Sequence, residues 1–396
     1  MIESHIHEWM NLLVRWIHFI VGVAWIGASF YFNWLENNLD RSSPQEDGIA
    51  GNLWAVHGGG FYHLKKFRTG PDALPPVLHW FKWEAYTTWL SGVTLLIIVY
   101  YFNARLYLID PDTRALSEAR AILISLISIL GTWFVYDILC RSPLKHHPRL
   151  LAGAILFYLV LLAYFLSEVF SGRAAYIHVG AAIGTMMVGN VFFVIIPAQK
   201  EMVDALESGR PLDPAVGGNG LLRSTHNNYL TLPVLFIMIS NHFPSTYGHG
   251  LNWLVLVLVS LASVAVRHYF NVRKIMKSLW WLLPGAFAVM VLIMWMTAPP
   301  SQQQSSVQFA GDGQVMAVVQ QRCTGCHSAQ PTQPGFSSPP AGLVLESPEQ
   351  IKTQAERIYQ AAVATRTMPI GNLTGMTDEE RQILGQWFKH QVGSGG

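Results

Sequence analysis

Long apolar runs dominate the first three quarters of the chain. Eight runs are long enough, or nearly so, to cross a bilayer as helices, for which about 20 apolar residues suffice. They cover residues 10–35, 84–102, 119–140, 150–170, 174–198, 229–243, 251–270 and 279–298. The sixth run is the shortest and contains Pro233. The pattern predicts a bundle of eight transmembrane helices.

The pattern changes abruptly after Ala298. Residues 299–306 are Pro, Ser and Gln without apolar periodicity, which is typical of a linker. Residues 307–396 then have ordinary polarity. We therefore expect a transmembrane domain over 1–298, a linker over 299–306 and a small soluble domain over 307–396.

Helix signals recur in this soluble tail, so the fold class predicted for the chain is all-α. One helix is expected over 313–322. A second is expected to begin after Ser347, a residue type that is favoured at the N-cap, with Pro348 in its first turn. The last begins at Thr377, because Glu380 follows at the spacing of a capping box.

The distribution of positive charge predicts the orientation. Loops 36–83, 141–149, 199–228 and 271–278 carry 14 Lys and Arg, whereas the loops on the other side carry 3. Positive loops stay in the cytoplasm, so the N-terminus and the tail are expected to lie outside. The first nine residues contain two Glu and no Lys or Arg, unlike a signal peptide, so we expect the first span to be retained.

Composition agrees with a membrane protein. Hydrophobic residues make up 51% of the chain and charged residues 13%, about half the share that is usual in soluble domains. The formal net charge of +2 gives no reason to expect nucleic acid as a partner. The bilayer is the expected surroundings.

The tail contains one motif that carries specific chemistry. Cys323-Thr324-Gly325-Cys326-His327 has the spacing of covalent c-type haem attachment, in which both thiols bind the haem and the histidine binds its iron. A zinc site would need a second ligand pair at suitable spacing, and the tail sequence offers none. One covalent haem c is therefore predicted.

The sixth iron ligand is expected to be Met368, which precedes Pro369 just before the last helix. Met316 and Met376 are the competing candidates. A His and Met ligand pair raises the reduction potential, which suits an acceptor of outward-moving electrons. Such haem is attached outside the bacterial cytoplasmic membrane, so we expect a multi-pass inner-membrane protein with a periplasmic tail.

Ionisable residues inside membrane spans are costly and therefore mark candidate sites. They form two sets, at the two ends of the predicted spans. The outer set is Arg15, His18, Glu168, His178 and His242, and the inner set is His79, Glu84, Asp137, His226, Arg267 and His268.

Two groups of histidines have alternative interpretations. His18 and His178 fall at similar predicted depths, so they would either bind a haem b between them or serve as hydrogen-bonded core residues. His57 and His63 flank three glycines, which permit either close approach of a ligand or a simple turn.

Taken together, the chain resembles the bacterial membrane-integral urate oxidases, also called urate hydroxylases, that end in a cytochrome c domain. The resemblance covers the whole chain in order. It is carried by Arg15-Trp16-Ile17-His18 through Trp25-Ile26-Gly27, by Val56-His57-Gly58-Gly59-Gly60-Phe61-Tyr62, and by the cysteine motif of the tail.

This resemblance implies oxidation of urate to 5-hydroxyisourate, with electrons passing to a class I-type cytochrome c domain. The haem ligands carry over to Cys323, Cys326, His327 and Met368. A soluble cytochrome c or a terminal oxidase would be the onward acceptor. In the membrane half, residues 1–298, the family gives no set of catalytic residues that carries over residue by residue.

Chemistry supplies the candidates there. Urate is a planar anion, which suits an arginine, and its oxidation releases protons, which requires a base. Glu84, Asp137, His226 and Arg267 are the inner candidates, and Arg15 and Glu168 the outer ones; the sequence leaves the side open. The alternative functions are a quinol-oxidising subunit and an electron-carrier cytochrome of a respiratory complex.

Overall fold

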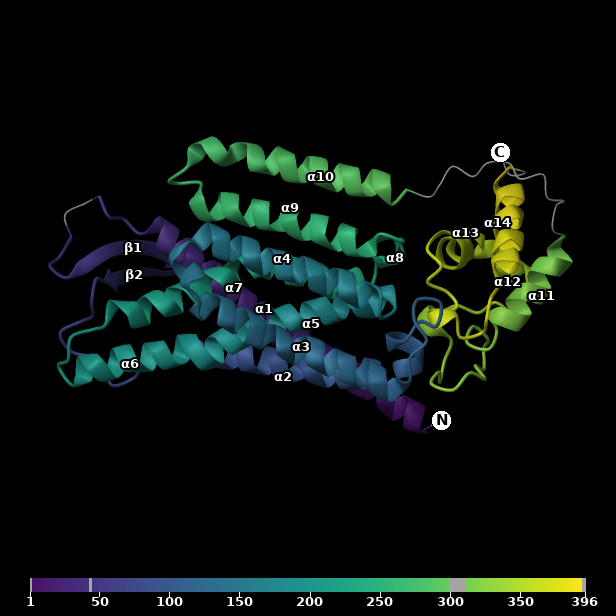
Figure 1. Ribbon diagram of the computed structural model, residues 1–396, viewed down its shortest axis with the longest axis horizontal. Helices are drawn as coiled ribbons and strands as arrows, with labels where there is room; N and C mark the ends of the chain where they lie inside the picture. The colour runs from purple at the N-terminus through teal and green to yellow at the C-terminus, as the bar shows by residue number, and fades with distance from the viewer. Residues whose placement is uncertain (1, 43–44, 299–310, 394–396) are drawn as a thin grey trace.

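The computed structural model describes residues 2–42, 45–298 and 311–393, so the predicted linker 299–306 lies outside the described residues. Most of the chain is helical (Figure 1). The helices of the first part are α1 (Ile2–Asn38), α2 (Trp83–Leu96), α3 (Glu118–Arg141), α4 (Pro148–Ser167), α5 (Gly172–Asn190), α6 (Ile196–Glu207), α7 (Pro214–Ser240), α8 (Pro244–Tyr247), α9 (Asn252–Val272) and α10 (Leu282–Met296). Shorter helical segments are η1 (Ile97–Tyr101), η2 (Ala104–Leu108), η3 (Pro143–His146), η4 (Val191–Ile195) and η5 (Lys277–Trp281).

Six of these helical stretches are long and apolar enough to cross a membrane, as expected of a multi-pass membrane protein. They are His5–Asn38, Glu118–Arg141, Pro148–Ser167, Gly172–Glu207, Asn252–Val272 and Lys277–Met296. Each coincides with one of the eight predicted spans. The other two predictions, 84–102 and 229–243, fall on helical segments that do not meet this standard of length and hydropathy.

The predicted sixth span was placed too late in the chain. Its helix, α7, begins at Pro214, fifteen residues before the predicted start, and runs through Pro233. Asp213 caps it, because its side chain accepts a hydrogen bond from the backbone N–H of Ala215 at 2.8 Å. The polar composition of its first turns had suggested a loop.

The prediction of an all-α fold was wrong for the first long loop, residues 36–83. Strands β1 (Ile49–His57) and β2 (Gly60–Phe67) pair there in an antiparallel hairpin. Gly58 and Gly59 form its two-residue turn with φ of +58° and +80°, a conformation that glycine adopts without steric cost. His57 and His63 thus belong to strands, Gly58 and Gly59 form the turn, and Gly60 begins β2.

The bundle surrounds one central helix. In Figure 1 the long helices run roughly along the longest axis, with the hairpin at one end and the tail at the other. In the apolar 18-residue segment of Gly172–Glu207, 61% of the residues are buried, whereas the share is 6% in that of His5–Asn38 and 11% in that of Lys277–Met296. Apolar helices with so little protein cover are suited to contact with lipid.

The tail folds as a small helical unit around its own core. Its elements are α11 (Asp312–Arg322), η6 (Pro340–Gly342), α12 (Pro348–Thr353), α13 (Ala355–Ile358), η7 (Tyr359–Ala364), η8 (Ile370–Asn372) and α14 (Asp378–Gly393). Val319, Leu384 and Trp387 are almost fully buried at its centre.

The helix starts predicted in the tail are confirmed. Ser347 and Gln350 form a reciprocal capping box at α12, with Pro348 in the first turn. Thr377 and Glu380 form another at α14: the Glu380 N–H donates to Thr377 Oγ1 at 3.3 Å, and the Thr377 N–H donates to the Glu380 carboxylate at 2.8 Å.

The tail contacts the end of the bundle at which η2 lies. Asn372 Nδ2 donates to Asp112 Oδ2 at 3.1 Å, and Ser337 Oγ donates to Glu8 Oε2 at 3.3 Å. Gly371 sits against the backbone of η2. These contacts join residues more than 250 positions apart and place the cysteine motif beside the bundle.

Candidate functional site

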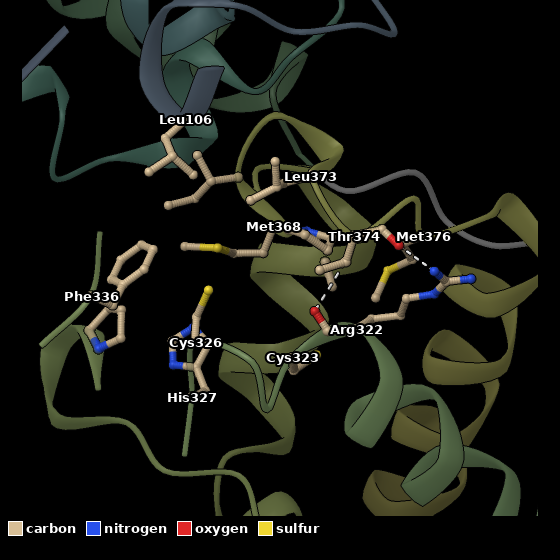
Figure 2. A pocket seen from close by; sticks show the side chains of 14 residues that line it. Leu106, Arg322, Cys323, Cys326, His327, Phe336, Met368, Leu373, Thr374 and Met376 are labelled. Carbon is tan, nitrogen blue, oxygen red and sulfur yellow. Dashed lines mark hydrogen bonds between the residues drawn. The ribbon is translucent and has the colours of Figure 1, made fainter. Parts of the chain in front are cut away.

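A hollow in the tail brings together all four residues predicted to hold haem c. Cys323, Cys326, His327 and Met368 line it, and most of the remaining lining is apolar (Figure 2). In the figure the Met368 side chain reaches into the space above Cys326 and His327. An apolar hollow with a few convergent polar groups is typical of cofactor sites.

The cysteine motif follows directly from the end of α11. The Cys323 carbonyl accepts hydrogen bonds from the N–H groups of Cys326 at 3.1 Å and His327 at 2.9 Å, which folds the motif into a tight turn. Burial raises the pKa of Cys323 to about 12 and also raises that of Cys326. All three cysteines of the chain are free thiols, so this pair is available for thioether bonds.

His327 is held in the orientation that an iron ligand needs. Its Nδ1 lies 3.1 Å from the carbonyl oxygen of Leu343. Because a carbonyl only accepts, Nδ1 carries the proton and Nε2 is left with a lone pair. Burial lowers the pKa of His327, which favours the neutral ring that binds metals.

The three methionines take different positions. Met368 and Met376 line the hollow, whereas Met316 packs against the tail core instead. Arg381 holds the loop that carries Met368, because its Nη1 donates to the carbonyls of Ala362 and Met368. The donor set around the hollow, two thiols, an oriented imidazole and a thioether, therefore fits a covalently attached haem.

The membrane half holds a buried polar network among α3, α5 and α7. Tyr136 Oη lies 2.8 Å from His226 Nδ1, and Asn190 Nδ2 donates to Tyr136 Oη at 2.9 Å. Arg223 forms an ion pair with Asp137 at 2.6 Å. Two of the inner candidates, Asp137 and His226, thus belong to one network.

The other two inner candidates lie apart from that network. Arg267 is buried on α9, where its Nε donates to Asn228 Oδ1 at 3.0 Å and its guanidinium stacks on Phe30 at 4.3 Å. Glu84 is half-buried in the first turn of α2, and its Oε2 has no hydrogen-bond partner among the described residues.

His18 and His178 contact different parts of the α2–η1 segment. His18 Nδ1 lies 3.0 Å from both the Thr88 carbonyl and Ser91 Oγ. His178 packs against Tyr100, with ring centroids 5.7 Å apart, and its Nδ1 lies 2.7 Å from the Ala174 carbonyl. Tyr100 is nine residues beyond Ser91, about 13 Å along a helix. A haem b between the two rings stays a prediction.

Sequence reasoning missed the residues on the bundle side of the hollow. Leu106 of η2 lines the hollow although it belongs to the membrane half. The next residue, Tyr107, contacts Arg173 of α5, whose guanidinium lies 5.1 Å from the tyrosine ring centroid. In the sequence Arg173 falls between the predicted spans 150–170 and 174–198, whereas the structure places it in the first turn of α5. Its positive charge at the outer end of a span was the available signal.

A comparison with known protein families supports the family resemblance of the membrane half. The family profile described as urate oxidase N-terminal matches residues 4–298, which is the whole of the bundle. No curated protein and no solved structure matches the chain. Because this family profile covers three quarters of the sequence, the chain belongs to the urate oxidase N-terminal family.

Proposed function

We propose that the protein oxidises urate to 5-hydroxyisourate in its membrane half and passes the electrons outward through a haem c in its tail. Family membership over 4–298 supports the substrate. The observation that carries the electron route is that Cys323, Cys326, His327 and Met368 line one hollow, directly against the bundle. In this proposal the chain spans the membrane eight times, and the tail and N-terminus are periplasmic.

The reaction balances without oxygen as a substrate. Urate and one water give 5-hydroxyisourate, two electrons and two protons, with the new C–O bond formed to the water oxygen. A covalently bound haem c supplies a one-electron redox centre. Each urate therefore requires two successive one-electron transfers out of the tail, to a soluble cytochrome c or a terminal oxidase.

The chain's own residues would hold the cofactor in defined roles. The thiols of Cys323 and Cys326 would attach it, and Nε2 of His327 and the thioether of Met368 would bind its iron. The Leu343 carbonyl fixes the imidazole, and Arg381 fixes the loop before Pro369. Such outer partners determine how firmly metal ligands are oriented.

An anaerobic spectral titration of the purified full-length protein tests this function. We expect urate to produce the absorption bands of a reduced c-type haem in the absence of oxygen. Reduction by a quinol with no response to urate would instead support the quinol-oxidising alternative. Consumption of urate only with oxygen, with stoichiometric peroxide, would contradict the proposal.

A further inference from the structure

A second polar cluster lies at the end of the bundle that faces the tail. It comprises Arg15 of α1, Tyr100 of η1, Tyr107 of η2, and Arg173 and His178 of α5. The Tyr107 ring centroid lies 6.3 Å from that of Tyr100 and 5.1 Å from the Arg173 guanidinium. The ring centroids of Tyr100 and His178 are 5.7 Å apart, and Arg15 lies within electrostatic range of Arg173. Both tyrosines come from π-helical segments, a distortion that is frequent at functional sites.

Among the described residues, two buried polar atoms of this cluster form no hydrogen bond of normal geometry: His178 Nε2 and Tyr100 Oη, although Arg173 lies close enough to Tyr100 to interact with it. Tyr100 is 4% exposed and His178 is fully buried. Leaving such groups buried and unpaired is unfavourable, and a bound ligand that pairs with them would remove that penalty. Because His178 Nδ1 faces the Ala174 carbonyl, Nε2 is the acceptor nitrogen, whereas Tyr100 offers a donor. The pair matches a ligand that carries both N–H and C=O groups.

Among the described residues, the two arginines of the cluster interact with neutral groups, and each donates a hydrogen bond to a side-chain amide. Arg15 Nη2 donates to Asn11 Oδ1 at 3.1 Å, and Arg173 Nε donates to Asn241 Oδ1 at 3.1 Å. In the part of the chain that the structure describes, neither forms an ion pair with a carboxylate. Two guanidinium groups within electrostatic range of each other and without a counter-charge favour the binding of an anion near them.

Other sites suit an anionic ligand less well. In the network of Tyr136 and His226, Arg223 is already neutralised by Asp137. A groove at the opposite end contains Lys82 and Lys200 but also Glu201 and Asp204.

Arg267 is the remaining rival for an anion. Its Nη2 and the Oδ1 of Asn271 are both buried without partners among the described residues. Both residues donate to Asn228 Oδ1, so a single water between them would satisfy both free atoms.

We propose that urate binds at this cluster, and this inference rests on the proposed function. The cluster consists of Arg15, Tyr100, Tyr107, Arg173 and His178. The arginines would hold the anion, Tyr100 would donate to a purine carbonyl, and His178 would accept from a purine N–H. The planar ring would lie among aromatic side chains, which also include Phe170, 4.9 Å from His178.

This location shortens the path of the electrons. Leu106 lines the haem hollow, and Tyr107 belongs to the cluster, so consecutive residues, with Cα atoms about 3.8 Å apart, connect the two sites. Tyr107 also lies within electrostatic range of Cys326. Electrons from urate bound here reach the tail without crossing the membrane, so no haem b relay is required.

Two neighbouring tyrosines provide a matched test. Tyr100→Phe removes a hydroxyl that forms no hydrogen bond of normal geometry among the described residues, whereas Tyr101→Phe removes one that lies 2.7 Å from Ser125 Oγ. With full-length protein, equilibrium dialysis of labelled urate should show about tenfold weaker binding for Tyr100→Phe and unchanged binding for Tyr101→Phe. A tenfold loss corresponds to about 1.4 kcal/mol. Equal binding by wild type and Tyr100→Phe would count against the hydroxyl as a ligand contact.

Variants of single basic residues test whether urate binds at this cluster or elsewhere. Arg173→Gln should weaken urate binding at least tenfold, whereas Arg267→Gln and Lys200→Gln should leave it unchanged. Haem content and reduction by ascorbate should match wild type in all of them, which shows an intact tail. Loss of binding in Arg267→Gln or Lys200→Gln, with normal binding in Arg173→Gln, would overturn the proposed site.

The binding and reduction measurements separate this inference from the function beneath it. Urate that binds wild type but not Arg173→Gln, without reducing the haem, would refute the electron route and leave the binding site standing. Urate that reduces the haem equally well in wild type and Arg173→Gln would leave the function standing and refute the site. A b-type haem spectrum that disappears in His178→Gln would also refute it, because Nε2 would then bind iron.

Discussion

The guanidinium of Arg322 forms an ion pair with the carboxylate of Glu380 at 3.0 Å, with both side chains largely shielded from water. Arg322 is the last residue of α11, and Glu380 closes the capping box of α14. Arg322 Nη1 also donates to the Thr374 carbonyl. The pair therefore fixes the start of the cysteine motif against the last helix of the tail.

Replacing Glu380 should destabilise the tail. Glu380→Gln leaves Arg322 without its counter-charge, and a hydrogen bond to a charged group contributes about 1.5–3 kcal/mol. We expect the free energy of unfolding of the tail to fall by about 2 kcal/mol, measured by denaturant titration of the full-length protein in detergent. Glu379→Gln, at an exposed neighbouring position, is the control; an equal loss there would show that the ion pair is not responsible.

Lowering the pH should remove the stabilisation that the ion pair of Arg322 and Glu380 gives the tail. Partial burial by itself raises the pKa of Glu380, but hydrogen bonds and charge from Arg322 outweigh it, so the net pKa is lowered. A carboxyl with a depressed folded-state pKa stabilises the fold above its unfolded value and loses that effect as the pH falls through the folded value. The ordinary pKa of a glutamate is 4.5. The stability difference between wild type and Glu380→Gln should therefore shrink as the pH falls below that value.

Local sequence signals predicted the tail helices well because their cause is local. The cap residues Ser347 and Thr377 satisfy free N–H groups within one turn, so the pattern and the structure coincide. The hairpin at 49–67 was missed because Leu53, Trp54 and Val56 have no clean alternation with polar residues. Trp54 stacks on His63 across the strands, a pairing that only the register reveals.

Removing either motif cysteine should weaken covalent haem attachment. In Cys323→Ala or Cys326→Ala at most one thioether can form, so haem staining on a denaturing gel should weaken strongly. Cys140→Ala is the matched control, since Cys140 is a free thiol buried in the membrane half. Normal staining in both motif variants would show that haem is not attached here.

Met368→Ala should change the iron ligation and leave the haem attached. The long-wavelength sulfur-to-iron band should disappear while haem staining persists. Met316→Ala should keep the band, because Met316 packs against the tail core and does not line the hollow. A normal band in Met368→Ala combined with its loss in Met376→Ala would move the ligand to Met376.

The sequence predicted the haem site but not the polar cluster at the end of the bundle, because only the haem site has a local sequence signal. The cysteine motif is contiguous, so spacing alone identified it. Tyr100 and Tyr107 could not be distinguished from the other tyrosines, because their significance depends on the π-helical turns that aim them at Arg173 and His178. Leu106 was beyond sequence reasoning, since only tertiary contact places it at the hollow.

The orientation predicted from 14 against 3 positive residues can be tested at the hairpin. A protease-sensitive tag inserted between Gly58 and Gly59, at the tip of a two-residue turn, should be tolerated. In intact spheroplasts, external protease should spare this tag and cleave one added after Gly396. The opposite result at either position would invert the proposed topology.

The contact between tail and bundle should govern how fast urate reduces the haem. A Cβ atom at Gly371 would stand 3.0 Å from the Ile109 carbonyl oxygen and 3.4 Å from that of Arg105, so Gly371→Val must push the tail away from η2. Electron transfer is steeply sensitive to distance, so urate-dependent reduction should slow at least tenfold. Reduction by ascorbate, which reaches the tail from solvent, should be unchanged.

The control for Gly371→Val is Gly342→Val. Gly371 and Gly342 have φ of +55° and +64°, so valine is strained at both positions, but nothing lies within 4 Å of a Cβ at Gly342. Backbone strain alone would slow both variants equally, whereas loss of docking would slow only Gly371→Val. Wild-type rates in Gly371→Val would mean that electrons enter the tail elsewhere than beside Leu106, and the route through η2 would have to be abandoned.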